Sequence, residues 1–326
     1  MKVVVTGGAG RLGASVVGGL VEHGHEVISL DRSALPGLPA ADQIAVDLTD
    51  AAATDAVFAR IRPEAVVHLA AIATPFSAPE VVIWDTNTSI AFHVLQSAVT
   101  HGATRVLASS SPTPLGYGAP TGWRPAYLPI DEQHPLRPWN AYAASKAAIE
   151  HLVAMFAAQQ GSAVAVGSFR PCFVLSPDEW AGAPTQQGHT VAERLADPAL
   201  AAVSLFNYID ARDAADFVDT WLAGAGELEN GQTFFVGAAD AFATKPLAEL
   251  IPQFVPGTEE LAAGLTGDAP AFSIAKAAAL LGWRPTRSWR TELVTAPPAD
   301  LSDSVVAPTT TDADNSAPAS SSREAR

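Results

Sequence analysis

A tyrosine and a lysine lie four residues apart, at Tyr142 and Lys146, in the stretch WNAYAASKAAIE of residues 139–150. The alanines of this stretch, together with its lysine and glutamate, favour a helix, and side chains four residues apart lie on the same helix face. The pair could be an ordinary surface contact, or a phenol whose proton a neighbouring ammonium makes easier to remove. Spacing alone does not separate these two interpretations, so the rest of the sequence has to.

A second motif places glycines between an expected strand and an expected helix. In VVVTGGAGRLGASVVGGL, residues 3–20, Gly7, Gly10 and Gly13 form a GxxGxxG turn. The three glycines permit a tight turn, a close approach of the backbone to a pyrophosphate, and close packing of helix on strand. Asp31, at the end of the next expected strand, can accept hydrogen bonds from the adenosine ribose hydroxyls. The pattern predicts a dinucleotide-binding site.

The end of this second strand also bears on the choice of cofactor. Asp31 would repel the 2′-phosphate of NADP, which favours NAD. Arg32 follows directly, and a guanidinium can pair with such a phosphate. We therefore expect NAD, with NADP as the alternative.

Short apolar runs alternate with helical patterns in the first half of the chain. Strands are expected at Lys2–Thr6, Glu26–Asp31, Ala65–Ala70, Arg105–Ser109 and Ala163–Phe169. Helices are expected at Leu12–His23, around Thr54–Arg60, at Val82–Thr100 and at Ala141–Gln160. This alternation predicts an α/β fold, a Rossmann-type doubly wound parallel sheet. Residues 1–170 are expected to form the NAD-binding domain and to carry the catalytic residues.

The pattern loosens after residue 170. Helices are expected at Glu193–Asp197, Ala211–Ala223 and Ala275–Leu281, and a late strand at Gln232–Gly237. We expect residues 171–296 to form a small C-terminal substrate lobe, with late elements that return to the sheet. Residues 297–326 are rich in Ala, Pro, Ser, Thr and Asp, a composition that predicts a disordered tail; a linker or interaction tail is the alternative.

The composition limits partners and compartment. Of 326 residues, 34 are acidic and 19 basic, which argues against nucleic acid or an anionic membrane as a partner, since polyanions bind clustered basic side chains. The one cysteine, Cys172, excludes an intrachain disulfide and a multi-cysteine zinc site, and the eight histidines show no metal spacing, so no metal is expected. Without a signal peptide or a membrane-spanning apolar run, a soluble, cytoplasmic protein is expected.

Further motifs follow the glycine turn in a set order. They are VDL at 46–48, HLAAIA at 68–73, ASSS at 108–111, YxxxK at 142–146, FNYIDARDAADFV at 206–218 and LLGWRP at 280–285. With these motifs the chain resembles the extended short-chain dehydrogenase/reductase family, the NAD-dependent epimerase/dehydratase group. The resemblance extends from residue 2 to about residue 289.

The resemblance implies cofactor contacts at the glycine turn and at the ends of several strands. The residues that it marks are Gly7, Gly10, Arg11, Leu12, Gly13, Asp31, Arg32, Asp47, Leu48, Leu69, Ala70, Ala71, Asn87, Ser109, Tyr142 and Lys146. Asp47 and Leu48 would lie by the adenine, and the backbone of residues 69–71 would pass beneath the cofactor. Asn87 would lie on the helix behind the active site.

The resemblance also implies a catalytic trio of Ser111, Tyr142 and Lys146. Three serines occur in a row; Ser111 is chosen because counting forward from Arg105 and back from Gly116 gives the same residue. Tyrosine has an ordinary pKa of about 10, and the Lys146 ammonium, with a positively charged nicotinamide, is expected to lower it. Tyr142 would then exchange a proton with a substrate hydroxyl, Ser111 would orient that oxygen, and Lys146 would also reach the nicotinamide ribose.

The chain departs from the nucleotide-sugar members of this family in ways that predict a smaller substrate. Those members carry R-x-x-N-V-Y-G-P, and here RPCFVLSP, residues 170–177, puts Phe173 in place of the asparagine that helps to hold a diphosphate. SSPTPLGY, residues 110–117, resembles a loop of uronate dehydrogenases, yet Pro112 and Thr113 replace its polar pair. Substrate contacts are expected from Thr74, Pro112, Thr113 and Phe173.

We therefore expect an NAD(P)-dependent oxidoreductase acting on an alcohol or hemiacetal of a small, sugar-like substrate. The runner-up is a nucleotide-sugar epimerase or dehydratase that recycles NAD, and a nucleotide-sensing protein without turnover is a third hypothesis. Trp123, Tyr127 and Trp139 could form a lid over the substrate or anchor the loop of residues 116–138. The resemblance also makes a homodimer through the helices of Asn87 and Tyr142 an expectation.

Overall fold

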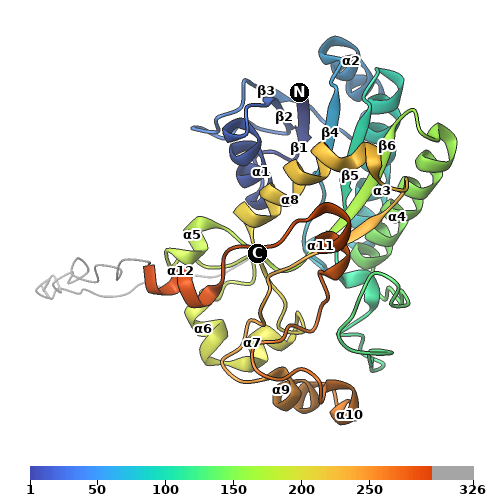
Figure 1. The fold of residues 1–326 in the computed structure, drawn as a ribbon. Helices are drawn as coiled ribbons and strands as arrows, with labels where there is room; N and C mark the ends of the chain where they lie inside the picture. Colours follow the sequence, from blue (N-terminus) through green and yellow to red (C-terminus); the bar gives the residue numbers. More distant parts are fainter. Residues whose placement is uncertain (296–326) are drawn as a thin grey trace, which may run out of the picture. The chain divides into compact units, whose positions relative to one another are not determined.

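A parallel sheet organises the computed structural model, which describes residues 1–295. Its strands are β1 (Lys2–Thr6), β2 (Glu26–Asp31), β3 (Asp42–Ala45), β4 (Ala65–His68), β5 (Arg105–Ser109), β6 (Ala165–Pro171) and β9 (Thr233–Val236). Their order across the sheet is β3–β2–β1–β4–β5–β6–β9 (Figure 1). The chain runs outward in one direction from β1 and in the other from β4. Open parallel sheets bind ligands in the crevice where the strand order reverses in this way.

Helices cover both faces of the sheet (Figure 1). They are α1 (Arg11–Glu22), α2 (Ala51–Ile61), α3 (Glu80–Thr100), α4 (Ala141–Gln160) and α8 (Ala211–Gly224). Val3 and Val5 pack with α1 and α8, while Val4 packs on the other face with α2, α3 and α4. Successive strand side chains point to opposite faces, so a strand that is apolar throughout has to be covered on both.

Smaller elements follow β6 and one precedes α4. They are η1 (Thr113–Leu115), β7 (Val174–Leu175), α5 (Pro177–Trp180), α6 (Val191–Ala196), α7 (Pro198–Ala202), β8 (Ile209–Asp210), η2 (Ala225–Glu227), α9 (Leu247–Phe254), α10 (Glu259–Ala262), α11 (Ala275–Leu281) and α12 (Trp289–Thr295). β7 and β8 pair in parallel as a separate two-stranded sheet. Several of these helices are a single turn long, so tertiary packing rather than intrinsic helix stability must hold them.

Most predicted elements of the first half are confirmed, some to the residue. Lys2–Thr6, Glu26–Asp31, Arg105–Ser109 and Ala141–Gln160 have the predicted bounds. The strand predicted to reach Ala70 ends at His68, because its partner on β1 ends at Thr6. The last strand of the half lies at Ala165–Pro171, two residues later than predicted, where β9 pairs with it. The edge strand β3 was not predicted, since its four residues are only partly buried.

The described residues fall within one compact unit. β9 comes from the second half of the chain and pairs with β6 of the first half. A division near residue 170 into a cofactor domain and a substrate lobe therefore stays a prediction. The tail predicted for residues 297–326 lies outside the described residues.

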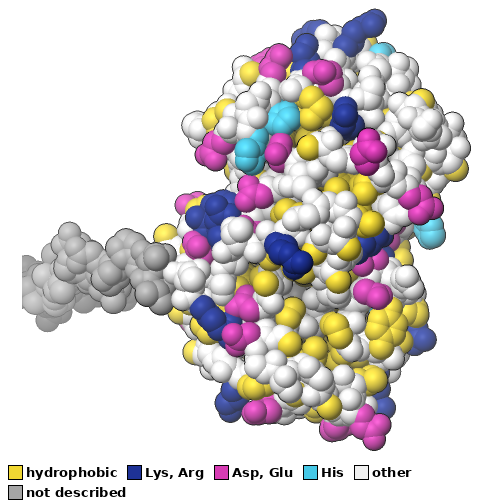
Figure 2. Space-filling model, viewed as in Figure 1, with side chains coloured by type: hydrophobic (Ala, Val, Ile, Leu, Met, Phe, Trp, Pro, Cys, Tyr) yellow, Lys and Arg dark blue, Asp and Glu magenta, His cyan; other side chains and the backbone are white. Residues whose placement is uncertain are grey.

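Basic and acidic side chains are mixed on the face of the described residues that Figure 2 presents. Within residues 1–295, none of the helices combines the length and the apolar character that crossing a membrane requires.

Candidate active site

A cleft of about 870 Å³ lies at the carboxyl ends of the strands. Each strand from the middle of the sheet contributes to its lining at or just after its last residue: Gly7, Asp31, Leu69, Ser109 and Pro171. This is the crevice where the strand order reverses between β1 and β4. We call the part around the glycine turn the cofactor end. The part around residues 171–207, with Thr74, Pro112, Thr113 and Tyr117, is the substrate end.

The glycine turn leaves no room for side chains at two positions. Gly7 has a φ of +73°, and a Cβ there would lie 2.7 Å from the Ala70 nitrogen. A Cβ on Gly13 would lie 2.0 Å from the Gly7 carbonyl oxygen. Gly10 caps α1 without a side-chain hydrogen bond, so the first N–H groups of the helix stay available to an anion. This cradle fits the pyrophosphate of a dinucleotide.

Asp31 lines the cofactor end of the cleft. Its Oδ2 accepts the Ala9 N–H at 3.1 Å, and its Oδ1 accepts the Arg32 N–H at 2.7 Å. Each carboxylate oxygen can accept a further hydrogen bond. Arg32 lines the same end of the cleft.

The other predicted cofactor residues line the cleft, with one exception. Arg11, Leu12, Asp47, Leu48, Leu69, Ala70, Ala71 and Ser109 are all in the lining. Asn87 lies behind it: its Oδ1 accepts the Ile72 N–H at 2.8 Å, and its Nδ2 donates to Ser145 Oγ at 3.1 Å. Asn87 therefore ties the cleft floor to α4, so its part in binding a cofactor is indirect.

The trio of Ser111, Tyr142 and Lys146 comes together in the lining of the cleft. The three residues are 6%, 8% and 3% exposed. Lys146 Nζ donates to the Ser109 carbonyl oxygen at 2.8 Å and lies 5.8 Å from the centre of the Tyr142 ring. Tyr142 and Lys146, four residues apart on α4, are thus a buried pair and not a surface contact.

The three consecutive serines have different partners. Ser109 Oγ donates to the Ser110 carbonyl, and Ser110 Oγ donates to Glu150 Oε1 at 2.6 Å. Ser111 Oγ instead accepts from the N–H and the hydroxyl of Thr113, at 3.2 and 3.1 Å. Two donors to one hydroxyl oxygen leave its own hydrogen to donate elsewhere, and Ser111 is near enough to the Tyr142 phenol to oppose the rise of its pKa. Geometry therefore favours Ser111, the residue chosen from the sequence.

Burial, rather than the lysine, dominates the acidity of Tyr142. It raises the pKa of Tyr142 to about 12, against the opposing hydrogen bond from Ser111. Burial also lowers the pKa of Lys146 to about 8. In the protein without cofactor, desolvation penalises the charged forms of both side chains, and the ammonium points to the Ser109 carbonyl. The lowering of the Tyr142 pKa by Lys146 beside a positively charged nicotinamide stays a prediction.

A buried ion pair supports the catalytic helix one turn beyond Lys146. Glu150 accepts from Arg170 Nε at 2.7 Å and from Arg170 Nη2 at 2.8 Å. It also accepts from Ser110, whose hydroxyl contacts the Lys146 carbonyl at 3.2 Å. This network links α4 to the ends of β5 and β6, and so fixes the height of Lys146 in the cleft.

The substrate end contains every predicted substrate residue and several that were missed. Thr74, Pro112, Thr113 and Phe173 line it, as do the unpredicted Tyr117, Gln186, Gln187, Val203, Ser204 and Asn207. Asn207 lies within the FNYIDARDAADFV motif, which is the one signal that could have marked it. Tyr117 ends the stretch SSPTPLGY, residues 110–117, but was not itself marked as a contact. The remaining four residues lie in no quoted motif, so no sequence pattern pointed to them.

A buried arginine lies behind the wall of the substrate end. The Arg194 guanidinium is 4.1 Å from the centre of the Phe173 ring and donates to Gln187 Oε1. Its Nε and Nη2 have no partner in the described part of the chain. Burial lowers the pKa of Arg194 to about 10, against the opposing charge of Glu179.

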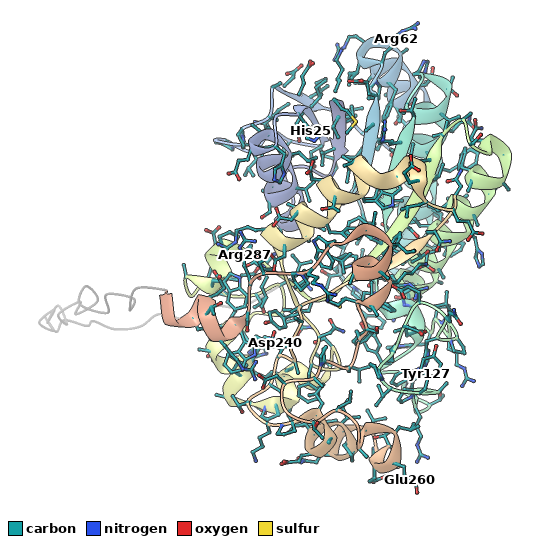
Figure 3. The ribbon with its side chains drawn as sticks, viewed as in Figure 1. His25, Arg62, Tyr127, Asp240, Glu260 and Arg287 are labelled. Carbon is teal, nitrogen blue, oxygen red and sulfur yellow. The ribbon has the colours of Figure 1, made fainter. Side chains whose placement is uncertain are left out.

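The aromatic side chains of the loop at residues 116–138 and of Trp139 are tied to that loop or its flanks. Trp123 Nε1 donates to the Leu115 carbonyl at 2.8 Å, and Trp139 Nε1 to the Tyr117 carbonyl at 3.2 Å. Tyr127, which Figure 3 shows on this loop, donates to Asp131 at 2.6 Å. None of the three lines the cleft. These contacts favour the anchoring interpretation over the lid.

No group of three or more potential ligand side chains in residues 1–295 is placed to hold a metal ion. Cys172 is a free, buried thiol packed in the apolar core, and burial raises its pKa.

Comparison with known proteins gives consistent matches. The model of the NAD-dependent epimerase/dehydratase family matches residues 3–237. A UDP-glucose 4-epimerase of Corynebacterium glutamicum is 28% identical over 87% of this chain and 91% of that protein. A UDP-glucose 4-epimerase of Streptomyces lividans is 36% identical, over 52% of this chain and 51% of its own length.

Solved structures share the architecture. A crystal structure of UDP-galactose 4-epimerase has a TM-score of 0.64 and 26% identity, covering 91% of this chain and 97% of that one. A short-chain dehydrogenase/reductase superfamily protein from Agrobacterium tumefaciens with bound NAD has a TM-score of 0.66 and 22% identity, covering 91% and 96%. The second likeness bears on the fold alone.

Proposed function

Because the chain belongs to the NAD-dependent epimerase/dehydratase family, we propose that it is a dehydrogenase that oxidises a secondary alcohol or hemiacetal of a small, sugar-like substrate. As a member of this family the chain is an enzyme that uses NAD. The glycine turn would hold the pyrophosphate and Asp31 the adenosine ribose. Lys146 would hold the nicotinamide ribose.

The catalytic trio has the groups that alcohol oxidation needs. Bound NAD supplies a hydride acceptor and a positive charge beside the phenol. Tyr142 takes the proton of the substrate hydroxyl, and the free hydrogen of Ser111 stabilises the charge that develops on that oxygen. Lys146, an ammonium below a pH of about 8, stabilises the Tyr142 phenolate. Burial of the trio excludes water and strengthens each of these electrostatic effects.

The observation that carries this proposal is that, within residues 1–295, no basic side chain lines the substrate end. The basic residues that line the cleft are Arg11, Arg32 and Lys146, which belong to the cofactor end and the trio. A nucleoside diphosphate is held best by arginine and lysine. Phe173 offers a ring in this place, and Arg194 lies behind that ring. A substrate without phosphates fits this wall better than a nucleotide sugar.

A nucleotide-sugar epimerase is the second candidate, because two relatives of the chain carry that activity in their names. Both the Corynebacterium glutamicum and the Streptomyces lividans proteins are UDP-glucose 4-epimerases. In such an enzyme the hydride would return to the oxidised intermediate. NAD would be recycled, and no NADH would accumulate.

A screen of substrates with NAD separates the two candidates. The protein is mixed with NAD or NADP and with aldoses, uronic acids, small alcohols or UDP-sugars, while NADH absorbance and sugar products are both followed. The proposal expects NADH to accumulate in proportion to an oxidised small sugar. Interconversion of UDP-glucose and UDP-galactose without NADH would establish the epimerase instead.

Dimer formation is a further proposal. Val81, Trp84 and Phe92 are 64%, 41% and 41% exposed on α3, the helix that carries Asn87 and packs on α4. Apolar side chains along one exposed helix would be covered if α3 and α4 met a second copy. Light scattering of the purified chain measures its mass in solution directly.

A further inference from the structure

Asn207 is a feature of the substrate end that the proposed reaction does not use. It lies two residues before β8, is 4% exposed and lines the cleft. Its Oδ1 accepts the Phe173 N–H at 2.9 Å. This contact sets the orientation of the carboxamide, because a flipped amide would place a donor against a donor. The Nδ2 group therefore points away from the Phe173 backbone.

The Nδ2 group of Asn207 is buried and has no hydrogen-bond partner among the described residues. A buried donor without a partner is costly, and native proteins keep few of them. Because Asn207 lines the cleft, a substrate that brought an acceptor oxygen would remove this cost on binding.

Tyr117 adds a second polar group beside Asn207. Burial raises the pKa of Tyr117, as do Cys172 and Tyr142 nearby, while the neighbouring Asn207 side chain opposes the rise. The phenol therefore stays protonated and can either donate or accept. Its ring is held edge-on by Trp123, with ring centres 6.1 Å apart. Tyr117 and Asn207 thus form a fixed polar corner next to the catalytic tyrosine.

The wall around this corner is uncharged. None of the lining residues 171–174, 186–187, 203–204 and 207 is acidic or basic. Neutral amides and hydroxyls suit alcohol oxygens, which donate and accept in the same way. An anion placed here would lack a partner of opposite charge on the wall, because Arg194 is fully buried against Phe173 and bonded to Gln187.

We propose that Asn207 Nδ2 and the Tyr117 hydroxyl form a subsite for a hydroxyl oxygen of an uncharged, polyhydroxylated substrate, a free sugar or polyol. The oxygen bound here belongs to a carbon other than the one that is oxidised. The inference rests on the proposed function and narrows its substrate to neutral molecules. Holding a second oxygen leaves the substrate one orientation, so the subsite selects which hydroxyl faces Tyr142.

The test compares Asn207→Asp with Gln159→Glu in the full chain. Asn207→Asp keeps an oxygen for the Phe173 N–H but replaces the donor by a carboxylate. Gln159→Glu makes the same exchange of amide for carboxylate at the exposed far end of α4. Calorimetry with NAD present measures the binding of glucose, galactose, sorbitol, galacturonate and UDP-galactose. Melting temperatures report folding, and a separate titration measures NAD affinity.

The neutral probe that binds the parent most tightly should bind Asn207→Asp about 10- to 100-fold more weakly, since a substrate hydrogen bond is lost. Gln159→Glu should stay within about twofold of the parent for both ligands, because its charge is remote and screened. Tyr117→Phe, which keeps the ring contacts, should lose about 3- to 10-fold; it decides the matter if Asn207→Asp does not fold.

Three results would overturn the subsite: unchanged sugar binding by both cleft variants, no binding of any neutral probe, or tighter binding of galacturonate or UDP-galactose than of every neutral probe. A neutral sugar that binds through Asn207 but yields no NADH leaves the subsite standing. That result would refute the proposed dehydrogenase instead.

Discussion

The two ends of the cleft are built by different means. At the cofactor end the backbone does the recognising: Gly7 and Gly13 have no room for a Cβ, and the start of α1 presents N–H groups. At the substrate end side chains form the wall, among them Phe173, Gln187 and Asn207. Backbone groups suit the phosphates that every dinucleotide shares. Side chains from loops suit a substrate that differs from one enzyme to the next.

Two buried arginines, Arg170 behind the catalytic helix and Arg194 behind the substrate wall, differ in how their charge is paired. Arg170, at the end of β6, makes two hydrogen bonds to Glu150 and supports the catalytic helix. Arg194, on α6, is stacked on Phe173 and leaves two nitrogens without a partner in the described chain. Arg170 therefore has its buried charge paired, while Arg194 forms no ion pair within residues 1–295, although the charge of Glu179 is near enough to affect its pKa.

The largest expected effect is a loss of kcat on substitution of Tyr142, which lies where the two ends of the cleft meet. Tyr142→Phe removes the only group proposed to exchange the substrate proton, so kcat should fall about 10³- to 10⁴-fold. NAD and sugar affinities, measured by calorimetry, should stay within about threefold, because neither end loses its own contacts. Full activity in this variant would mean that the catalytic assignment is wrong. Unchanged NAD binding by a parent without any turnover would favour the nucleotide-sensing hypothesis.

The paired and unpaired arginines should differ in stability. Arg170→Met leaves the Glu150 carboxylate buried without its cation, so the free energy of unfolding should fall by about 3–5 kcal/mol. Arg194→Met removes a cation that forms no ion pair in the described chain, so its effect should be within about 1 kcal/mol or stabilising. Urea unfolding of both variants tests the contrast. A large loss in Arg194→Met would show that its stacking on Phe173 stabilises the fold.

One added methyl group at the glycine turn should weaken NAD binding at the cofactor end. In Gly13→Ala the added carbon would meet the Gly7 carbonyl at 2.0 Å, so the turn must shift and NAD should bind about 100-fold more weakly. Gly18→Ala is the matched control on the same helix, since nothing lies within 4 Å of its added carbon. It should leave NAD affinity unchanged and stabilise the protein by about 0.5–1 kcal/mol. Equal NAD affinity in both variants would contradict the cradle.

The smallest expected effect is on the free energy of unfolding and comes from the buried ammonium of Lys146. Burial lowers the Lys146 pKa to about 8, so between that pH and its unfolded pKa the unfolded chain binds more protons, and stability rises with pH. Lys146→Met removes the cost of burying the charge. Its free energy of unfolding should exceed that of the parent by about 2 kcal/mol at neutral pH, and the gap should close by about pH 10. Unfolding curves across this range measure it; a constant gap would exclude the linkage.

Local patterns predicted the first half of the fold far better than the second. All of β1 pairs with β2, and the apolar runs of these two strands predicted that they are buried. The elements after β6 are short, and polar ties place them: Asp210 accepts from Trp180 Nε1 at 2.8 Å, and Asp213 accepts from Arg287 Nη1 at 2.6 Å. Figure 3 shows Arg287 in the segment that leads into α12. Such hydrogen bonds join residues far apart in sequence, and no periodic pattern predicts them.

The candidate site divides in the same way. The glycine turn, Asp31, the trio and the four substrate residues were predicted from the sequence, and all of them line one cleft. Tyr117 and Asn207 were not marked, because their places in the wall follow from contacts between distant segments.

Sequence alone determined the alternation of strands and helices, the glycine turn and the presence of Tyr142 and Lys146 on one helix face, because each depends on spacing within one segment. Tertiary structure alone decided that burial raises the Tyr142 pKa and that the described lining of the substrate end is neutral. These properties depend on how much water each group loses and which partners it gains. Both are set by segments that only the fold brings together.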